Sequence, residues 1–132
     1  MFNQQWLKAN RILIVDDEPD ICIMLKEVLE GSGFEVSYFD DHALALESFE
    51  TGLYELLVLD IKMPKIDGFR LCKEIKKMDN KVKVCFLTAS DSYYEKIRHE
   101  EFPTLDKNSV LSKPIENKDL IRQINRIIGQ TS

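Results

Sequence analysis

The sequence has little that would support disulfide bonds, a zinc-type site or a redox centre. It contains three cysteines, Cys22, Cys72 and Cys85, and no Cys-x-x-Cys pair. Each cysteine lies within an apolar pattern, which favours reduced cysteines in the core of a cytosolic protein. The two histidines, His42 and His99, have no Cys or His near them at ligand spacing. A metal site built on soft ligands is therefore not predicted.

The sequence also lacks a long apolar run that could cross a bilayer, and its beginning lacks the hydrophobic segment of a signal peptide. We therefore expect a soluble, cytoplasmic protein without a membrane partner. Apolar residues make up 44% of the chain and charged residues 31%, as in ordinary globular proteins. A length of 132 residues predicts one domain with one core.

The net charge of −5 disfavours direct binding to nucleic acid, which needs a basic surface. The charge is unevenly distributed, because residues 62–83 carry eight Lys or Arg against three Asp or Glu. The rest of the chain carries ten basic residues against twenty acidic ones. The basic stretch is either a solvated helix face or a docking patch for an acidic partner.

Short apolar runs alternate with amphipathic segments along the whole chain. We expect strands at residues 11–15, 35–39, 56–60, 82–88 and 110–112. We expect helices from Pro19 to Gly31, from a cap at Asp40 or Asp41 to Gly52, from Phe69 to Met78, from Tyr93 to Glu101, and from a cap at Asn117 to Ile128. Strands that alternate with helices predict an α/β fold, with a parallel sheet covered by helices on both faces.

Residues with functional side chains follow the predicted strands at the point where each strand ends. Asp16 and Asp17 follow the first strand, Asp60 ends the third, Thr88 ends the fourth and Lys113 follows the fifth. Right-handed crossovers place all these strand ends at one edge of the sheet, where open α/β sheets bind ligands. The topology therefore gathers residues that are far apart in the sequence.

Three carboxylates at one edge repel each other, and a hard divalent cation would relieve the repulsion. Mg²⁺ fits best, because it needs only one or two carboxylates and also engages phosphate. Lys113 and the Thr88 hydroxyl could contact a phosphoryl group on Asp60. Taken singly, Asp16 and Asp17 could be helix-capping acids, and Thr88 and Lys113 could be ordinary strand and surface residues. Their joint placement at successive strand ends favours a site for phosphoryl transfer.

These residues resemble the receiver domain of two-component response regulators. The matching segments are Ile12–Pro19, Leu57–Pro64 with Asp67-Gly68, Phe86–Ala89 and Lys113-Pro114. The resemblance covers residues 11 to 128. It implies a doubly wound (βα)5, flavodoxin-like sandwich with five parallel strands in the order 2-1-3-4-5. Residues 1–10 would then be an N-terminal extension and residues 11–130 the receiver domain, with no output domain in this chain.

The resemblance also implies roles for individual residues. Asp60 would be the phosphoacceptor; Asp17, Asp60 and the backbone carbonyl of Lys62 would bind Mg²⁺, and Asp16 would act through a metal-bound water. Thr88 and Lys113 would bind the phosphoryl group, and the Lys113–Pro114 peptide bond would be cis.

The implied partners are a sensor histidine kinase or phosphotransfer protein and a downstream protein or output domain. A homodimer is left open. Phosphorylation would change the surface around the fourth helix, fifth strand and fifth helix. The chain would be a signalling domain that catalyses only its own phosphorylation and dephosphorylation.

One position departs from the family pattern. Many receivers carry a Tyr or Phe three residues before the conserved lysine, where this chain has Val110. The aromatic part of the switch is either missing or supplied by another residue such as Tyr93, Tyr94 or Phe102.

Two other functions are alternatives. The first is a phosphate-independent interaction module on the same fold. The second is a Mg²⁺-dependent phosphohydrolase, which the absence of Asp-x-Asp after the third strand disfavours.

Overall fold

The computed structural model describes residues 11–89 and 109–129. The expected helix from Tyr93 to Glu101 and the residues Tyr93, Tyr94 and Phe102 lie outside these ranges, as do residues 1–10. Within the ranges, five strands form one parallel sheet in the order β2-β1-β3-β4-β5, which confirms the predicted doubly wound fold. The strands are β1 (Arg11–Val15), β2 (Glu35–Phe39), β3 (Leu56–Asp60), β4 (Lys83–Thr88) and β5 (Val110–Ser112).

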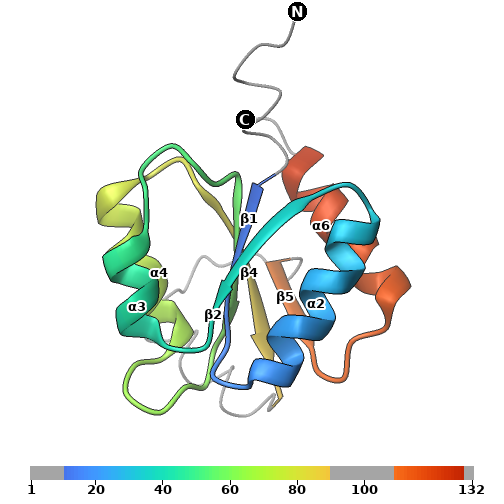
Figure 1. Ribbon diagram of the computed structural model, residues 1–132, viewed down its shortest axis with the longest axis horizontal. Coiled ribbons are helices and arrows are strands. Elements are labelled where there is room, and N and C mark those ends of the chain that lie inside the picture. The colour runs from blue at the N-terminus through green and yellow to red at the C-terminus, as the bar shows by residue number, and fades with distance from the viewer. Residues whose placement is uncertain (1–10, 90–108, 130–132) are drawn as a thin grey trace, which may run out of the picture.

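Within the described ranges, four helices cover the two faces of the sheet (Figure 1). One face is covered by α2 (Pro19–Gly31) and α6 (Asn117–Gly129), and the other by α3 (His42–Ser48) and α4 (Gly68–Met78). The helix α2 begins at Pro19, where the missing backbone N–H costs no hydrogen bond.

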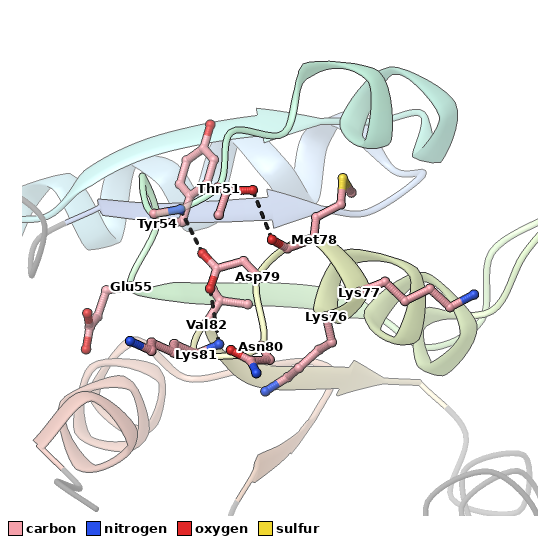
Figure 2. Close-up of a pocket in the computed structure, with 11 residues that line it drawn as sticks. Thr51, Tyr54, Glu55, Lys76, Lys77, Met78, Asp79, Asn80, Lys81 and Val82 are labelled. Atoms are coloured by element: carbon pink, nitrogen blue, oxygen red, sulfur yellow. Dashed lines mark hydrogen bonds between the residues drawn. The ribbon is translucent and has the colours of Figure 1, made fainter.

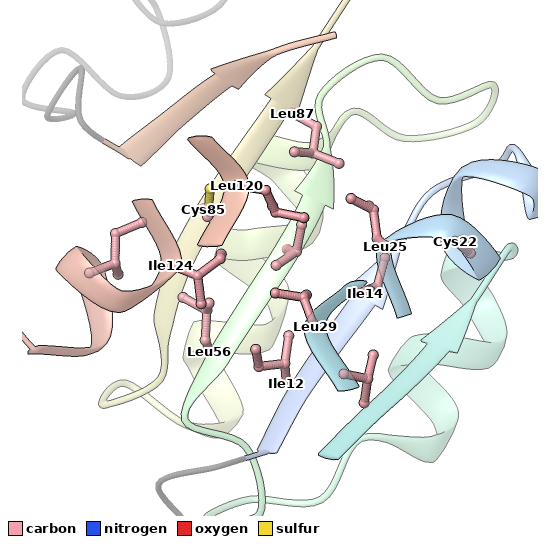
Figure 3. Close-up of a cluster of buried hydrophobic side chains, with 13 residues drawn as sticks. Ile12, Ile14, Cys22, Leu25, Leu29, Leu56, Cys85, Leu87, Leu120 and Ile124 are labelled. Atoms are coloured by element: carbon pink, nitrogen blue, oxygen red, sulfur yellow. The ribbon is translucent and has the colours of Figure 1, made fainter. Parts of the chain in front are cut away.

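Each face of the sheet has its own hydrophobic cluster. Figure 3 shows the cluster under α2 and α6, in which Ile12 and Ile14 from β1 meet Leu25, Leu29 and Ile124. The other cluster lies under α3 and α4, and in it the Phe69 and Phe86 rings are 4.6 Å apart between centroids. All five residues of β3 are buried, as expected for the central strand of a parallel sheet.

Two predicted helix boundaries are wrong. The helix α3 ends at Ser48 and not at Gly52, because Phe49 adopts an extended backbone and its side chain packs into the core. Gly52 instead occupies a later turn with a φ of 81°, a conformation that glycine adopts easily. Asn117 is the first residue of α6 and not the residue before it.

Candidate functional site

Asp60 ends β3 at the carboxyl edge of the sheet, and its backbone pairs with Leu87 of β4. The residue is only 4% exposed. The chain then turns back sharply, since the Gly68 N–H donates to the Ile61 carbonyl at 2.7 Å. Asp67 caps α4 by accepting from the backbone N–H of Arg70 at 2.8 Å. The turn fixes the start of α4 directly beside the Asp60 backbone.

Gly68 is required at this close approach. A Cβ atom at position 68 would collide with the Asp60 carbonyl oxygen and lie 3.0 Å from the Ile61 Cα. Both neighbours are backbone atoms of a buried strand end, so neither can move without disturbing the sheet. The absent side chain therefore lets α4 pack against the strand that carries Asp60.

Asp16 follows β1 and is fully buried. Its Oδ1 accepts a hydrogen bond from the Glu18 backbone N–H at 2.9 Å, and its own N–H donates to the Phe39 carbonyl at 3.2 Å. The Cys22 thiol donates to the Asp16 carbonyl with a sulfur–oxygen distance of 3.3 Å. Contacts from α2 and β2 thus hold the acidic loop in place.

Lys113 brings a positive charge to the same edge. Its backbone N–H donates to the Thr88 carbonyl at 2.7 Å, which fixes it beside the end of β4. Its Nζ lies 2.9 Å from Asp16 Oδ2, 3.2 Å from Glu18 Oε1 and 3.5 Å from Asp60 Oδ1. The Lys113 side chain is 11% exposed, so its pairs with the buried Asp16 and Asp60 are largely shielded from water, whereas Glu18 is 61% exposed. The Lys113–Pro114 peptide bond is cis, as the resemblance implies.

The other predicted site residues lie at the same edge or in the loops that leave it. Thr88 is buried at the end of β4, in register with Ser112 of β5. Asp17 follows Asp16 and lies close enough to Asp60 to affect its ionisation. Lys62 is exposed in the loop between β3 and α4.

Burial and mutual repulsion disfavour the charged forms of the carboxylates in this site. Burial and the charge of Asp16 raise the pKa of Asp60 to about 7, although the Lys113 ammonium opposes the rise. Burial likewise raises the pKa of Asp16, again against the effect of Lys113. Burial alone would lower the pKa of Lys113, but the carboxylates of Asp16, Asp60 and Glu18 outweigh it and the pKa is raised. The Lys113 ammonium therefore offsets only part of the negative charge of these acids.

The donor set fits a hard divalent cation. Asp16 Oδ2 is buried and lies 2.9 Å from the Lys113 ammonium, and among the described residues no other group donates a hydrogen bond to it. Carboxylate oxygens of Asp16, Asp17 and Glu18 lie within 4.8 Å of one another. Oxygen ligands with surplus negative charge are what Mg²⁺ prefers. The cluster of Asp16, Asp17 and Glu18 therefore fits such an ion.

Glu18 and Gly68 have contacts here that sequence reasoning did not assign. Glu18 pairs with Lys113 across 95 positions of the chain. Its place after two acids was the only signal, and its side chain remains 61% exposed at the start of α2. Gly68 was visible as part of the Asp67-Gly68 motif, but its close approach to the Asp60 backbone depends on how α4 packs.

Val110 occupies the position where many receivers have an aromatic residue. It pairs with Phe86 in the sheet and is half-buried against the cluster under α3 and α4. Phe86, its partner in β4, is fully buried, and its ring packs against Phe69. An aromatic side chain at position 110 itself is therefore not available to turn inward.

Comparison with known proteins agrees with this geometry. The family model of the response regulator receiver domain matches residues 12–125. The chain is 32% identical over 121 residues to the alkaline phosphatase synthesis transcriptional regulatory protein PhoP of Bacillus subtilis, covering 92% of the chain and 49% of that protein. It is 30% identical to the response regulator receiver protein CpdR of Brucella abortus, covering 89% of the chain and 96% of CpdR.

The fold is also similar to solved receiver domains. The non-phosphorylated HemR receiver domain of Leptospira biflexa superposes with a TM-score of 0.77 at 29% identity, over 92% of this chain and 96% of that one. The chain spans about half the length of the first curated relatives it matches. Receiver domains are signalling domains of two-component systems and not classical enzymes. Fold, strand-end residues and comparisons agree, and the chain belongs to the response regulator receiver domain family.

Proposed function

We propose that this domain accepts a phosphoryl group on Asp60 in a two-component phosphorelay. The observation that carries the proposal is the position of the Lys113 ammonium, 2.9 Å from Asp16 and 3.5 Å from Asp60 in a largely buried cluster. An ammonium between two buried acids is also placed to contact a phosphoryl group attached to either carboxylate. Asp60 is the better acceptor, because it ends the central strand while Asp16 is engaged with the Glu18 backbone.

The chemistry is a substitution at phosphorus. An Asp60 carboxylate oxygen forms a bond to the phosphorus of a phosphohistidine, and the phosphorus–nitrogen bond breaks, with its electron pair returning to the imidazole. Asp60 must be ionised to attack, and its pKa of about 7 in the metal-free site leaves part of the population protonated at neutral pH. Lys113 favours the ionised form and would neutralise charge on the transferred group.

Asp16, Asp17, Asp60 and the Lys62 carbonyl would hold Mg²⁺. When bound, the ion supplies positive charge that offsets the acids and the phosphoryl oxygens. Thr88 would donate its hydroxyl to a phosphoryl oxygen.

A sensor histidine kinase or a phosphotransfer protein would supply the phosphoryl group, and a downstream protein or an output domain would respond to it. PhoP, about twice as long as this chain, is by its name a transcriptional regulator, so control of transcription is one such output. CpdR, in contrast, is matched over 96% of its length. Relatives of both kinds fit the same phospho-accepting role.

The proposal is tested by incubating the protein with acetyl phosphate and Mg²⁺, followed by intact-mass measurement. We expect one phosphoryl group on the wild type and none on Asp60→Asn. Asp119→Asn removes an exposed carboxylate on α6 and is the matched control, which should be labelled as the wild type is. If wild type and Asp60→Asn are labelled equally, Asp60 is not the acceptor.

Val110 gives a reason to keep the second candidate, a phosphate-independent interaction module. Many receivers turn an aromatic side chain inward at this position, and the valine cannot make that movement. Partner binding that is unchanged by Asp60→Asn and by beryllofluoride with Mg²⁺ would favour this module. Binding that requires beryllofluoride would favour the phosphorylation-dependent receiver.

A further inference from the structure

A depression in the surface lies at the edge of the sheet opposite to Asp60. It has a volume of about 630 Å³ and is formed by the loops that lead into β3 and β4. Thr51, Gly52, Tyr54 and Glu55 line one side of it, and residues 76–82 line the other (Figure 2). None of these residues takes part in the phosphoryl site.

Hydrogen bonds between the two loops hold this depression in shape. The Asp79 side chain accepts from the Gly52 N–H at 2.8 Å and from the Lys81 N–H at 3.1 Å. The Thr51 hydroxyl donates to the Met78 carbonyl at 3.0 Å. A ligand would therefore meet a preformed surface and would not have to order these loops.

The two acids that line the depression are already engaged. Asp79 accepts the two backbone hydrogen bonds above, and Glu55 is paired with the Lys83 ammonium at 3.3 Å. Lys76 and Lys81 also line it, and in Figure 2 their side chains lie on either side of Asn80. The lining thus holds three lysines, Lys76, Lys77 and Lys81, against two acids, a formal charge of +1, although the protein as a whole carries −5.

The positive surface continues along α4. A second hollow of about 310 Å³ is lined by Arg70, Lys73, Glu74 and Lys77, and Lys77 lines both hollows. Glu74 is the only acid among residues 68–78, and it pairs with Lys77 at 3.1 Å. Arg70 lies in the first turn of α4, where the helix dipole disfavours a cation, so helix stability does not explain its charge.

We infer that this basic surface, made of Arg70, Lys73, Lys76, Lys77 and Lys81, is a docking site for an acidic segment of a partner protein. The occupant is an extended stretch rich in Asp and Glu whose acidic side chains face these cations. Residues 70–77 of a helix rise about 10 Å, which about four extended residues would cover. A segment of this length stays within the basic surface.

The charge of the remaining surface separates this occupant from nucleic acid. Outside residues 62–83 the chain carries ten basic against twenty acidic residues. A nucleic acid would extend beyond α4 and meet this negative surface, whereas a short acidic segment would not. The docking site is also independent of the proposed phosphorylation, since it shares no residue with the site around Asp60.

Fluorescence anisotropy with a short labelled peptide of alternating Glu and Ala tests the inference at an ionic strength of about 0.15 M, where charges more than about 8 Å apart are largely screened. We expect the wild type to bind this peptide and not the matched peptide with Gln in place of Glu. The double variant Lys76→Glu/Lys81→Glu should bind about tenfold more weakly. Lys26→Glu/Lys118→Glu changes the net charge equally on other helices and should bind within about twofold of the wild type, because long-range charge effects alone are small. Asp60→Asn should bind as the wild type does, which separates this test from that of the proposed function.

Three results would overturn the docking site. One is a wild type that does not bind the Glu peptide, or binds the Gln peptide equally well. Another is equal loss of binding in both double variants, since net charge and not this surface would then be responsible. The third is tighter binding of a single-stranded oligonucleotide with the same number of charges. Circular dichroism of each variant checks that the fold is retained.

Discussion

Asp60 is buried and has a raised pKa, and both properties follow from the residues around it. The pKa of about 7 lies well above the ordinary value of 3.8, because burial and Asp16 disfavour the charged form. The folded protein therefore binds a proton on Asp60 that the unfolded chain has already lost at neutral pH. Stability falls as the pH rises from 4 to 7, and the loss is complete above the folded-state pKa.

We accordingly expect Asp60→Asn to stabilise the metal-free protein at pH 8 by about 1–3 kcal/mol. The neutral amide has a similar shape but removes one of the repelling charges. The difference should vanish below pH 4, where Asp60 is protonated in both states. Urea unfolding in the presence of a chelator measures both values, and a variant no more stable than the wild type at pH 8 would contradict the electrostatic account.

Gly68 gives a second prediction for a single residue. Gly68→Ala should destabilise the protein by about 2–4 kcal/mol, because the new Cβ collides with the Asp60 carbonyl oxygen. Gly31→Ala is the matched control, since Gly31 is also helical and a Cβ there meets nothing within 4 Å. The control should be neutral or stabilising by up to about 1 kcal/mol. Thermal unfolding of both variants would show equal effects if the close approach were unimportant.

Among the described helices, α3 is the shortest, and its stability depends on the hydrogen bonds that cap its first turn. The Asp41 side chain accepts from the backbone N–H groups of Ala43 at 2.7 Å and Leu44 at 3.3 Å. The sequence left Asp40 and Asp41 as equal candidates for this cap. The backbone decides between them, because Asp41 is the extended residue directly before the helix.

Asp41→Ala should therefore cost about 1 kcal/mol of folding stability, through the loss of the cap. Asp40→Ala removes the neighbouring acid without removing these hydrogen bonds, and should change stability by less than about 0.5 kcal/mol. Chemical denaturation of the two variants is the measurement. A larger loss from Asp40→Ala than from Asp41→Ala would reverse the assignment.

The molecule gathers Asp16, Asp17 and Asp60 at one end of the sheet, its acidic end, whereas the basic surface runs along α4 toward the opposite end. The acidic end has the composition of a Mg²⁺ site, so the ion should stabilise the folded protein by mass action.

Within the residues described, no helix is long and apolar enough to span a bilayer.

At a Mg²⁺ concentration ten times the dissociation constant, we expect about 1.4 kcal/mol of added stability. The thermal midpoint should rise with Mg²⁺ and return to its starting value when a chelator is added. Asp17→Asn should abolish the rise, and Asp119→Asn, which removes an acid far along the chain on α6, should leave it intact. Stabilisation that survives in Asp17→Asn would place the ion elsewhere.

The sequence by itself determined the order of the described elements, the parallel sheet and the edge at which Asp16, Asp60, Thr88 and Lys113 lie. These follow from local patterns, since apolar runs, helix periodicity and the handedness of crossovers are all readable along the chain. Only the tertiary structure decided which of these groups touch. The pairing of Glu18 with Lys113 and the bonds from Thr51 and Gly52 to Met78 and Asp79 link residues distant in sequence. The collision that excludes a side chain at Gly68 depends on how closely α4 approaches β3. Such contacts depend on how whole helices pack against the sheet, which no local pattern records.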